Sequence, residues 1–265
     1  CAGVLTSGDP TPPNGPKAVI QRPVDVLAWG NSAEEIGELA QRRRSPRLEH
    51  FVLAEHVRFC HRDAQLSEAK LVVSAIPVQF IREAWTRLAE HIPLGVPVVS
   101  VAKGIENDTL LRPTQIIADV LRKTGRDDPD KPPRAIGCLS GPTIASELAR
   151  CLPAAMIAAS DDAEFARQVQ DLFTTSWLRV YTNTDLIGVE LAGAVKNVIA
   201  IAAGIVDGLQ AGNNAKSMLL ARGLAEITRL AAASLSASWR TVSLIGWPRC
   251  GSDPRPPASP RPGWW

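Results

Sequence analysis

Residues 69–77 read AKLVVSAIP, a short apolar run that is closed by a proline. Such a run predicts a buried strand that stops at Pro77, because proline cannot donate to a strand ladder. The following segment, 79–92, has apolar side chains at helical spacing, and 97–102 (PVVSVA) predicts another strand. This succession of strand, helix and strand favours a parallel sheet that is covered by helices.

The same alternation continues in both directions along the chain. Further strands are predicted at 24–29, 57–59, 135–139, 154–159 and 178–181, and further helices at 112–123, 143–148 and 161–173. Ser32 and Glu35 form a capping box for a short helix that ends near Arg42–Arg44. From Asp185 to about Ala233 the pattern is helical, with an interruption around 208–214. The fold class predicted is α/β: a doubly wound parallel sheet followed by a helical region.

Composition narrows the class of protein. The net charge of the 265 residues is +2, which implies no strong field for nucleic acid or a membrane surface. The five cysteines are scattered and lack metal-ligand spacing, so we expect thiols in a reducing, cytoplasmic compartment and no metal site. Residues 236–265 are rich in proline and arginine without periodicity, and we expect a disordered tail there.

The most unusual segment is 188–208, GVELAGAVKNVIAIAAGIVDG, because a single lysine lies in an apolar run. Burial lowers the pKa of a lysine, and a lowered pKa suits it to accept a proton. Asn197 follows Lys196 directly, and Glu190 precedes it by six residues. The alternative is a lysine that extends its charge to water. The polar residues argue against a membrane span, so we expect a buried helix of a water-soluble protein.

Two more segments place polar residues directly after predicted strands. Lys103 and Gly104 follow the strand at 97–102, and SGPT at 140–143 follows the strand at 135–139. Ligands of open α/β sheets bind beyond the carboxyl ends of the strands. Pro142 suits the first position of a helix, whose free N–H groups, with the hydroxyl of Thr143, would bind an anion. Lys103, Thr143 and Lys196 are therefore expected to line one crevice that suits a small phosphorylated substrate beside a dinucleotide.

Three segments in this order resemble the NAD(P)-dependent glycerol-3-phosphate dehydrogenase family. They are 98–106 (VVSVAKGIE), 139–147 (LSGPTIASE) and 188–204 (GVELAGAVKNVIAIAAG), and 212–216 with 222–229 continue the match. The resemblance covers roughly Val24 to Ala233. It implies a Rossmann-like sheet that lacks its first strand, then a partial all-α domain. It also implies hydride transfer between sn-glycerol 3-phosphate and dihydroxyacetone phosphate with NAD or NADP.

The resemblance also implies a role for individual residues. Lys196 would be the catalytic proton acceptor, and Lys103 would contact both substrate and cofactor. Further substrate contacts are implied for Gly141, Thr143 and Asn197, and further cofactor contacts for Asn31, Pro77 and Ala145. Residues 1–176 would form the incomplete dinucleotide-binding domain and 177–235 the partial helical substrate domain. The complete protein would be a homodimer without nucleic-acid partners or a membrane span.

The chain departs from the family pattern in two ways. No Gly-x-Gly-x-x-Gly turn is present to hold a pyrophosphate, and the later helical ligands for the substrate phosphate are missing. We therefore expect weak dinucleotide binding and little or no turnover. The choice between NAD and NADP stays open, because no acidic residue ends the strand that contains Trp29. The alternatives are a related β-hydroxyacid dehydrogenase and a non-catalytic, incomplete gene product.

Overall fold

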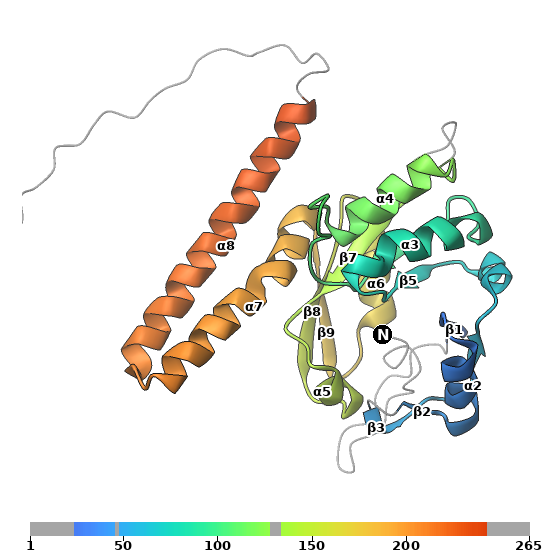
Figure 1. Ribbon diagram of the computed structural model, residues 1–265, viewed down its shortest axis with the longest axis horizontal. Coiled ribbons are helices and arrows are strands. Elements are labelled where there is room, and N and C mark those ends of the chain that lie inside the picture. Colours follow the sequence, from blue (N-terminus) through green and yellow to red (C-terminus); the bar gives the residue numbers. More distant parts are fainter. Residues whose placement is uncertain (1–23, 46–47, 128–133, 243–265) are drawn as a thin grey trace, which may run out of the picture.

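The computed structural model describes residues 24–45, 48–127 and 134–242, and its main part is a five-stranded sheet (Figure 1). The strands lie in the order β5-β6-β7-β8-β9. Their bounds are Val72–Ser74 for β5, Val98–Ser100 for β6, Ile136–Ser140 for β7, Ala154–Ser160 for β8 and Leu178–Asn183 for β9. All five strands had been predicted from the apolar runs.

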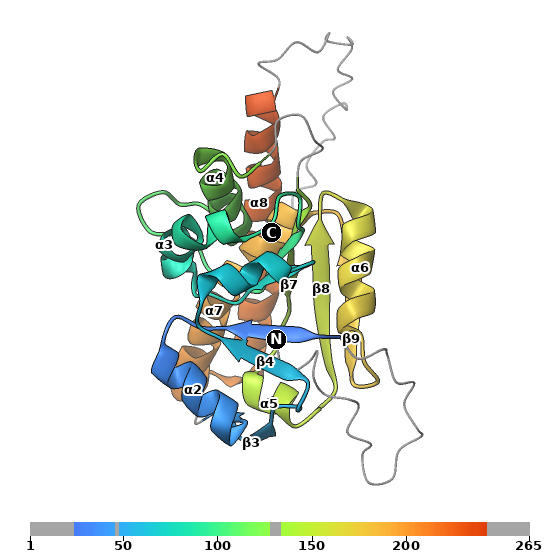
Figure 2. The ribbon, with the colours of Figure 1, turned by 90° about the vertical axis from the view of Figure 1, so that its right-hand side faces the viewer.

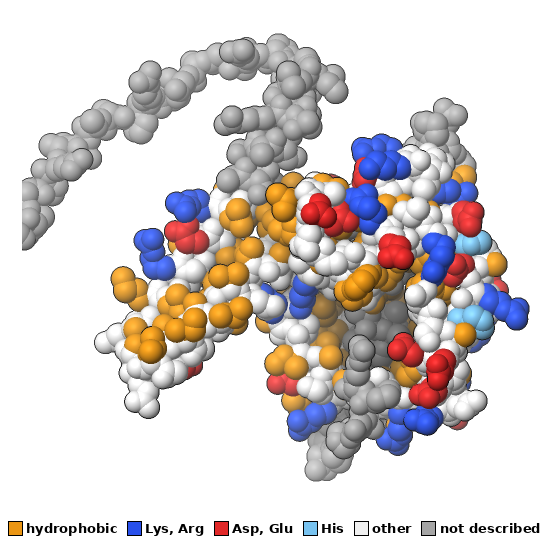
Figure 3. Space-filling view, viewed as in Figure 1, with side chains coloured by type: hydrophobic (Ala, Val, Ile, Leu, Met, Phe, Trp, Pro, Cys, Tyr) orange, Lys and Arg blue, Asp and Glu red, His pale blue; other side chains and the backbone are white. Residues whose placement is uncertain are grey.

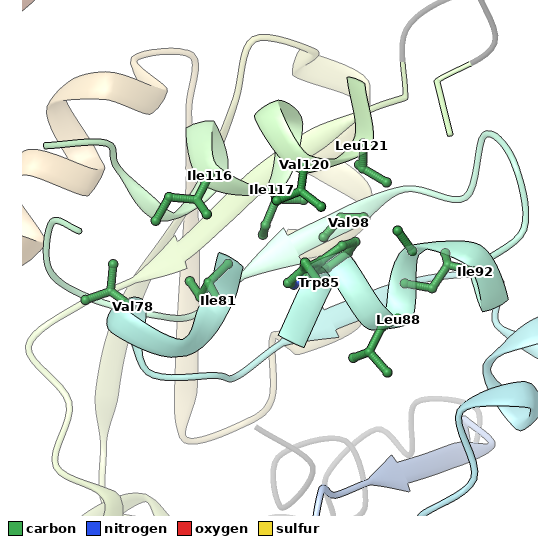
Figure 4. Packing of buried hydrophobic residues seen from close by; sticks show 11 residues of the cluster. Val78, Ile81, Trp85, Leu88, Ile92, Val98, Ile116, Ile117, Val120 and Leu121 are labelled. Atoms are coloured by element: carbon green, nitrogen blue, oxygen red, sulfur yellow. The ribbon is translucent and has the colours of Figure 1, made fainter. Parts of the chain in front are cut away.

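Helices cover both faces of this sheet. Successive side chains of a strand point to opposite faces, and in β6 Val98 joins the core on one face while Val99 joins the core on the other. Helices α3 (Val78–Leu88) and α4 (Pro113–Lys123) pack on the face of Val98, with the buried Trp85 between them (Figure 4). Helix α6 (Ala163–Phe173) covers the other face. The doubly wound α/β architecture is thus confirmed.

One strand pair differs from the parallel arrangement that the sequence predicts. Pairs β5–β6, β6–β7 and β8–β9 are parallel, but β7 and β8 are antiparallel. The connection between β7 and β8 contains only the five-residue helix α5, Ala145–Ala149. Parallel neighbours are usually joined by a full helix that returns along the face of the sheet, and this connection has none. The chain therefore turns back along the neighbouring strand.

A smaller unit precedes the main sheet. Strands β1 (Val26–Trp29) and β4 (Val57–Cys60) form a parallel pair that runs across the direction of β8 (Figure 2). Helix α2 (Ala33–Arg42) begins as predicted, because the Ser32 side chain accepts a hydrogen bond from Glu35 N. The antiparallel pair of β2 (Arg44–Ser45) and β3 (Leu48–Val52) was not predicted.

The last described residues form a helical hairpin that projects from the sheet unit (Figure 1). It consists of α7 (Leu186–Gly208) and α8 (Gly212–Val242). The expectation that α7 is buried throughout is wrong, since Val198, Ile201 and Ile205 are 67%, 67% and 57% exposed. Only the first turns of α7 reach the sheet. Apolar side chains consequently gather on the surface of the hairpin (Figure 3).

Helix α7 is the one helix in the described ranges that is long and apolar enough to cross a membrane. Length and composition are weak evidence, because the core helix of a water-soluble protein passes the same test. Within the helix, Glu190 is buried and bonded to Arg112 and Thr114 of the sheet unit. These bonds join the helix to the α/β unit. Helix α7 is therefore not a clear membrane span.

Two of the predicted boundaries need correction. The boundary at 176/177 is wrong because β9 pairs with β8, so the sheet unit continues to Asn183. The tail was predicted to begin at Ser236, but α8 continues to Val242. Alanine favours helix, and ASLSA at 233–237 extends the helix instead of ending it. Residues 1–23 and 243–265 lie outside the described part of the chain.

Candidate functional site

The loops that follow β6 and β7 meet at the carboxyl edge of the sheet. Lys103 lies three residues beyond β6, and its Nζ donates to the backbone oxygen of Gly141 at 2.9 Å. Gly141 directly follows β7, which is parallel to β6. The structure therefore brings together Lys103 and Gly141, as the order of the strands predicted.

Gly104 allows the loop to pass close to helix α3. Its φ is +118°, and a Cβ at this position would lie 2.9 Å from Cγ1 of Val78. Only glycine adopts this conformation without strain, and a side chain here would also displace the start of α3. The Gln79 side chain fixes the same loop by donating to the oxygen of Ile105 at 2.9 Å. Pro77, the N-cap of α3, is exposed and adjoins this edge.

Helix α7 approaches the same edge at Gly193. A Cβ there would lie 2.8 Å from Oγ of Ser140 and 3.9 Å from Cγ of Lys103. The missing side chain therefore lets the helix backbone lie against both residues. Helix α7 lies this close to the sheet unit because a glycine occupies this turn.

Lys196 lies one turn beyond Gly193, on the face of α7 that approaches Lys103 at Gly193. Burial, and then the positive charge of Lys196, lower the pKa of Lys103 below its usual value. Lys196 itself is only half-buried, and its Nζ donates to Oδ1 of the exposed Asn197 at 3.0 Å. The expected fully buried amine at 196 is therefore wrong, because α7 at this point is covered on one side only.

The expected anion site at a helix start after β7 is also wrong. Helix α5 begins at Ala145 with Ile144 as its N-cap, so Pro142 does not occupy the first helical position. Thr143 is half-buried, and its backbone N–H is bonded to the oxygen of Gly141 at 2.9 Å. Thr143 thus lies next to the carbonyl that holds Lys103, whereas Ala145 is exposed at the start of a short helix.

Asn31 lies apart from this group. Its Oδ1 accepts a hydrogen bond from Nη2 of Arg87 at 2.8 Å, near the last turn of α3. Pro77 lies at the first turn of the same helix, which is about 16 Å long at 1.5 Å per residue. The pair β1–β4 shares no ladder with the five-stranded sheet. The structure therefore does not bring Asn31 together with Pro77 and Lys103.

A buried ionic network joins α7 to the start of α4, and this network was not predicted from the sequence. The carboxylate of Glu190 on α7 accepts hydrogen bonds from Thr114 N at 3.0 Å and from Thr114 Oγ1 at 2.6 Å, and it pairs with Nη1 of Arg112. Burial raises the pKa of Glu190, and the bonds from Thr114 and Arg112 act against that rise. The one available signal was a carboxylate in an apolar helix, since such a group needs a partner.

The fold and the site define a class of α/β proteins. In this class a Rossmann-like unit is followed by a helical unit that lies against the carboxyl edge of the sheet. The family described as NAD-dependent glycerol-3-phosphate dehydrogenase N-terminus matches residues 16–166, and its C-terminal counterpart matches residues 185–247. The chain belongs to this family. The match extends to residue 247, so the expected end of the resemblance at about Ala233 is wrong.

Individual relatives agree with this assignment. The chain is 42% identical over 207 residues to NAD(P)+ glycerol-3-phosphate dehydrogenase 2 of Lactobacillus delbrueckii, a match over 78% of this chain and 60% of the relative. It is 43% identical over 209 residues to the glycerol-3-phosphate dehydrogenase of Geobacter sulfurreducens. The chain thus spans about 60% of the length of these curated relatives.

Solved structures share the fold. A glycerol-3-phosphate dehydrogenase from Coxiella burnetii is similar with a TM-score of 0.69 and 30% identity, over 79% of this chain and 62% of that one. A glycerol-3-phosphate dehydrogenase from Saccharomyces cerevisiae gives a TM-score of 0.66 at 23% identity, over 86% of this chain and 65% of that one. The second likeness concerns the fold alone.

Proposed function

We propose that this chain binds a phosphorylated triose and a nicotinamide dinucleotide at the edge formed by Lys103, Gly141 and Lys196. The proposed reaction interconverts sn-glycerol 3-phosphate and dihydroxyacetone phosphate with NAD or NADP. The observation that carries the proposal is the convergence of two lysines from different units on one edge of the sheet. Family membership and the names of the relatives support the substrate class.

The two lysines are suited to different tasks. Lys103 is anchored by Gly141 and would present its remaining N–H groups to the substrate oxygens. Among the residues that the structure describes, Nζ of Lys196 donates to Asn197 on the exposed side of α7, and it would accept the proton of the C2 hydroxyl when the alcohol is oxidised. In the reverse direction the same Nζ would return the proton to the C2 oxygen. Thr143 and Asn197 would orient the substrate.

The residues at this edge fit a dinucleotide at its nicotinamide end. Lys103 supplies a cation at this edge, and the adjoining Pro77 is exposed. Pro77, Lys103 and Ala145 would hold the cofactor, and Asn31 remains a proposed contact for its far end. When bound, the nicotinamide would supply the hydride acceptor or donor at C4. The structure favours neither NAD nor NADP.

Two expectations belong to the same proposal. A cytoplasmic location agrees with the reduced thiols of Cys60 and Cys138, which are both buried. A homodimer in the complete protein is proposed from the family resemblance. The reading as a β-hydroxyacid dehydrogenase is disfavoured by family membership, and the reading as a non-catalytic product is an outcome of the experiment below.

The test uses the chain as it stands. NADH and NADPH are titrated by fluorescence, with and without dihydroxyacetone phosphate, and consumption of the reduced cofactor is followed by absorbance. The proposal expects dihydroxyacetone phosphate to bind to the wild type, and it expects Lys196→Met to abolish any turnover. Lys70→Met, which removes an exposed lysine, is the matched control and keeps both properties. Absence of binding in the folded wild type would support the non-catalytic reading and refute the proposal.

A further inference from the structure

Helix α7 meets the sheet unit through its first two turns. Its buried side chains are Leu186, Val189, Glu190 and Leu191. Leu186 and Val189 form a small apolar cluster with Cys138 and Ala159. Apolar contacts of this kind are not directional. The cluster therefore holds the helix on the sheet but leaves its rotation and axial position weakly specified.

Glu190 adds contacts that are directional. Its carboxylate accepts bonds from the backbone and hydroxyl of Thr114, and it pairs with the Arg112 guanidinium. The Glu190 and Arg112 side chains are 2% and 10% exposed. Charge-assisted bonds are shorter and stronger than neutral ones and tolerate little misalignment. Both donors belong to the start of α4, where the helix dipole also favours a negative charge.

The position of Glu190 relates directly to the site. Gly193 follows Glu190 by three residues, and Lys196 follows Gly193 by three. Residues three apart are neighbours on a helix surface, and six residues advance the helix by about 9 Å. A rotation or slide of α7 at Glu190 would therefore displace Gly193 from Ser140 and would move Lys196 away from Lys103.

We propose that Glu190 is a positioning residue, whose carboxylate, held by Arg112 and Thr114, fixes the rotation and axial position of α7 and so places Lys196 beside Lys103. The consequence for catalysis rests on the proposed function, but the positioning itself does not. If Glu190 only stabilised the fold, its replacement would have a different effect. The replacement would lower the unfolding temperature, but α7 would stay in place in every folded molecule.

The experiment measures the position of α7 without substrate or cofactor. The ideal Cβ at Gly193 lies 3.9 Å from Cβ of Ser140, within the range of about 3.5–4.5 Å that a disulfide requires. In the full chain that carries Ser140→Cys and Gly193→Cys, a mild oxidant should join the two residues. Peptide mapping identifies this bond among the natural cysteines, and its rate of formation reports how often α7 occupies its place.

Three variants are compared in this background, well below their unfolding temperatures. Glu190→Gln is expected to slow bond formation at least about tenfold, because it leaves Arg112 buried without its counter-charge. Thr114→Val removes one hydrogen bond and should slow it about two- to fivefold. Glu226→Gln makes the same chemical change on the exposed surface of α8 and should leave the rate unchanged.

Hydrogen exchange provides a second measurement in chains with natural Ser140 and Gly193. Glu190→Gln should speed exchange of the amides of 189–199 relative to those of β6. An unchanged cross-linking rate in folded Glu190→Gln would overturn the proposal. If that variant does not fold, Thr114→Val decides, and an unchanged rate there would overturn it. If the chain with Ser140→Cys and Gly193→Cys cross-links while the wild type binds no dihydroxyacetone phosphate, the proposed function is refuted and the positioning role still stands.

Discussion

The Nζ of Lys103 donates to the backbone oxygen of Gly141 at 2.9 Å and thereby joins the loops that follow two neighbouring parallel strands. One N–H of the ammonium group is used in this bond. The amine consequently has a fixed direction towards the side on which α7 brings Gly193 and Lys196. A cation that is held in this way needs little reorganisation to bind an anionic ligand.

Replacement of Lys103 tests the role of this cation in ligand binding. We expect Lys103→Met to weaken binding of dihydroxyacetone phosphate by about tenfold or more, because a hydrogen bond to a charged group contributes about 1.5–3 kcal/mol. The affinity is measured by calorimetry in the presence of NADH. Lys70→Met is the control. Equal affinities for Lys103→Met and the wild type would show that the ligand does not contact Lys103.

Two glycines of α7 give a matched test of how the helix lies against the sheet. A Cβ at Gly204 would meet nothing within 4 Å, whereas a Cβ at Gly193 would meet Ser140 Oγ at 2.8 Å. Gly204→Ala should raise the free energy of unfolding by about 0.5–1 kcal/mol, since alanine favours helix. Gly193→Ala should lose this gain, because crowding in a packed contact costs about 1–3 kcal/mol.

The crowding at position 193 can be relieved separately. Ser140→Ala removes the Oγ that a new Cβ would meet, so the double variant Gly193→Ala/Ser140→Ala should recover stability relative to Gly193→Ala. Denaturant unfolding of the wild type, Gly193→Ala, Ser140→Ala and the double variant measures this coupling. Equal gains from Gly193→Ala and Gly204→Ala would mean that α7 does not lie against Ser140.

An ionic group beside the Lys103 loop predicts sensitivity to acid. Arg82 bonds to Glu106 Oε2 at 2.8 Å and to Asp119 Oδ2 at 2.7 Å. Arg82 lowers the pKa of Glu106, and Lys123 together with Arg82 lowers that of Asp119 to about 2. The folded pKa of each carboxyl is thus below its unfolded value. Their stabilisation is complete above the unfolded values, about pH 4–4.5, and is lost as the pH falls towards 2.

Thermal unfolding between pH 6 and pH 2 measures this loss. Arg82→Met should flatten the decline chiefly through Glu106, and the further change Lys123→Met should remove the part that belongs to Asp119. Arg167→Met, at an exposed pair with Glu164, is the control and should keep the wild-type slope. An unaltered slope in Arg82→Met would contradict the assignment.

Much of the site could be predicted because its parts follow local rules. Lys103 and Gly141 each follow an apolar run, and adjacent parallel strands bring such positions to one edge. The pairing of Glu190 with Arg112 spans 78 residues and depends on how α7 docks, which no local pattern encodes. Gly193 also looked like an ordinary small residue until its neighbour Ser140 was known.

The fold could be predicted from the sequence to about the same extent as the site. Strands β5, β6 and β7 and helices α3 and α4 have clear periodicity, so their order and their parallel pairing follow from the sequence. The direction of β8 depends on the connection through α5, and the sequence pattern does not reveal whether a short helix crosses the face of the sheet or only turns the chain. The exposure of Val198 and Ile201 could not be predicted, because apolar composition indicates a buried face only when another element covers it.

The central claim is that Lys103 and Lys196 share one site, and competitive acylation of the lysine amines across a range of pH tests it most directly. The labelling of Lys103, followed by mass spectrometry, should titrate below the usual range of a lysine. In Lys196→Met the midpoint should move upward, because one of the two causes of the lowered pKa is removed. Lys216→Met, which removes a lysine that pairs with Asp207, should leave the midpoint unchanged. A Lys103 midpoint that is the same in the wild type and in Lys196→Met would contradict the account.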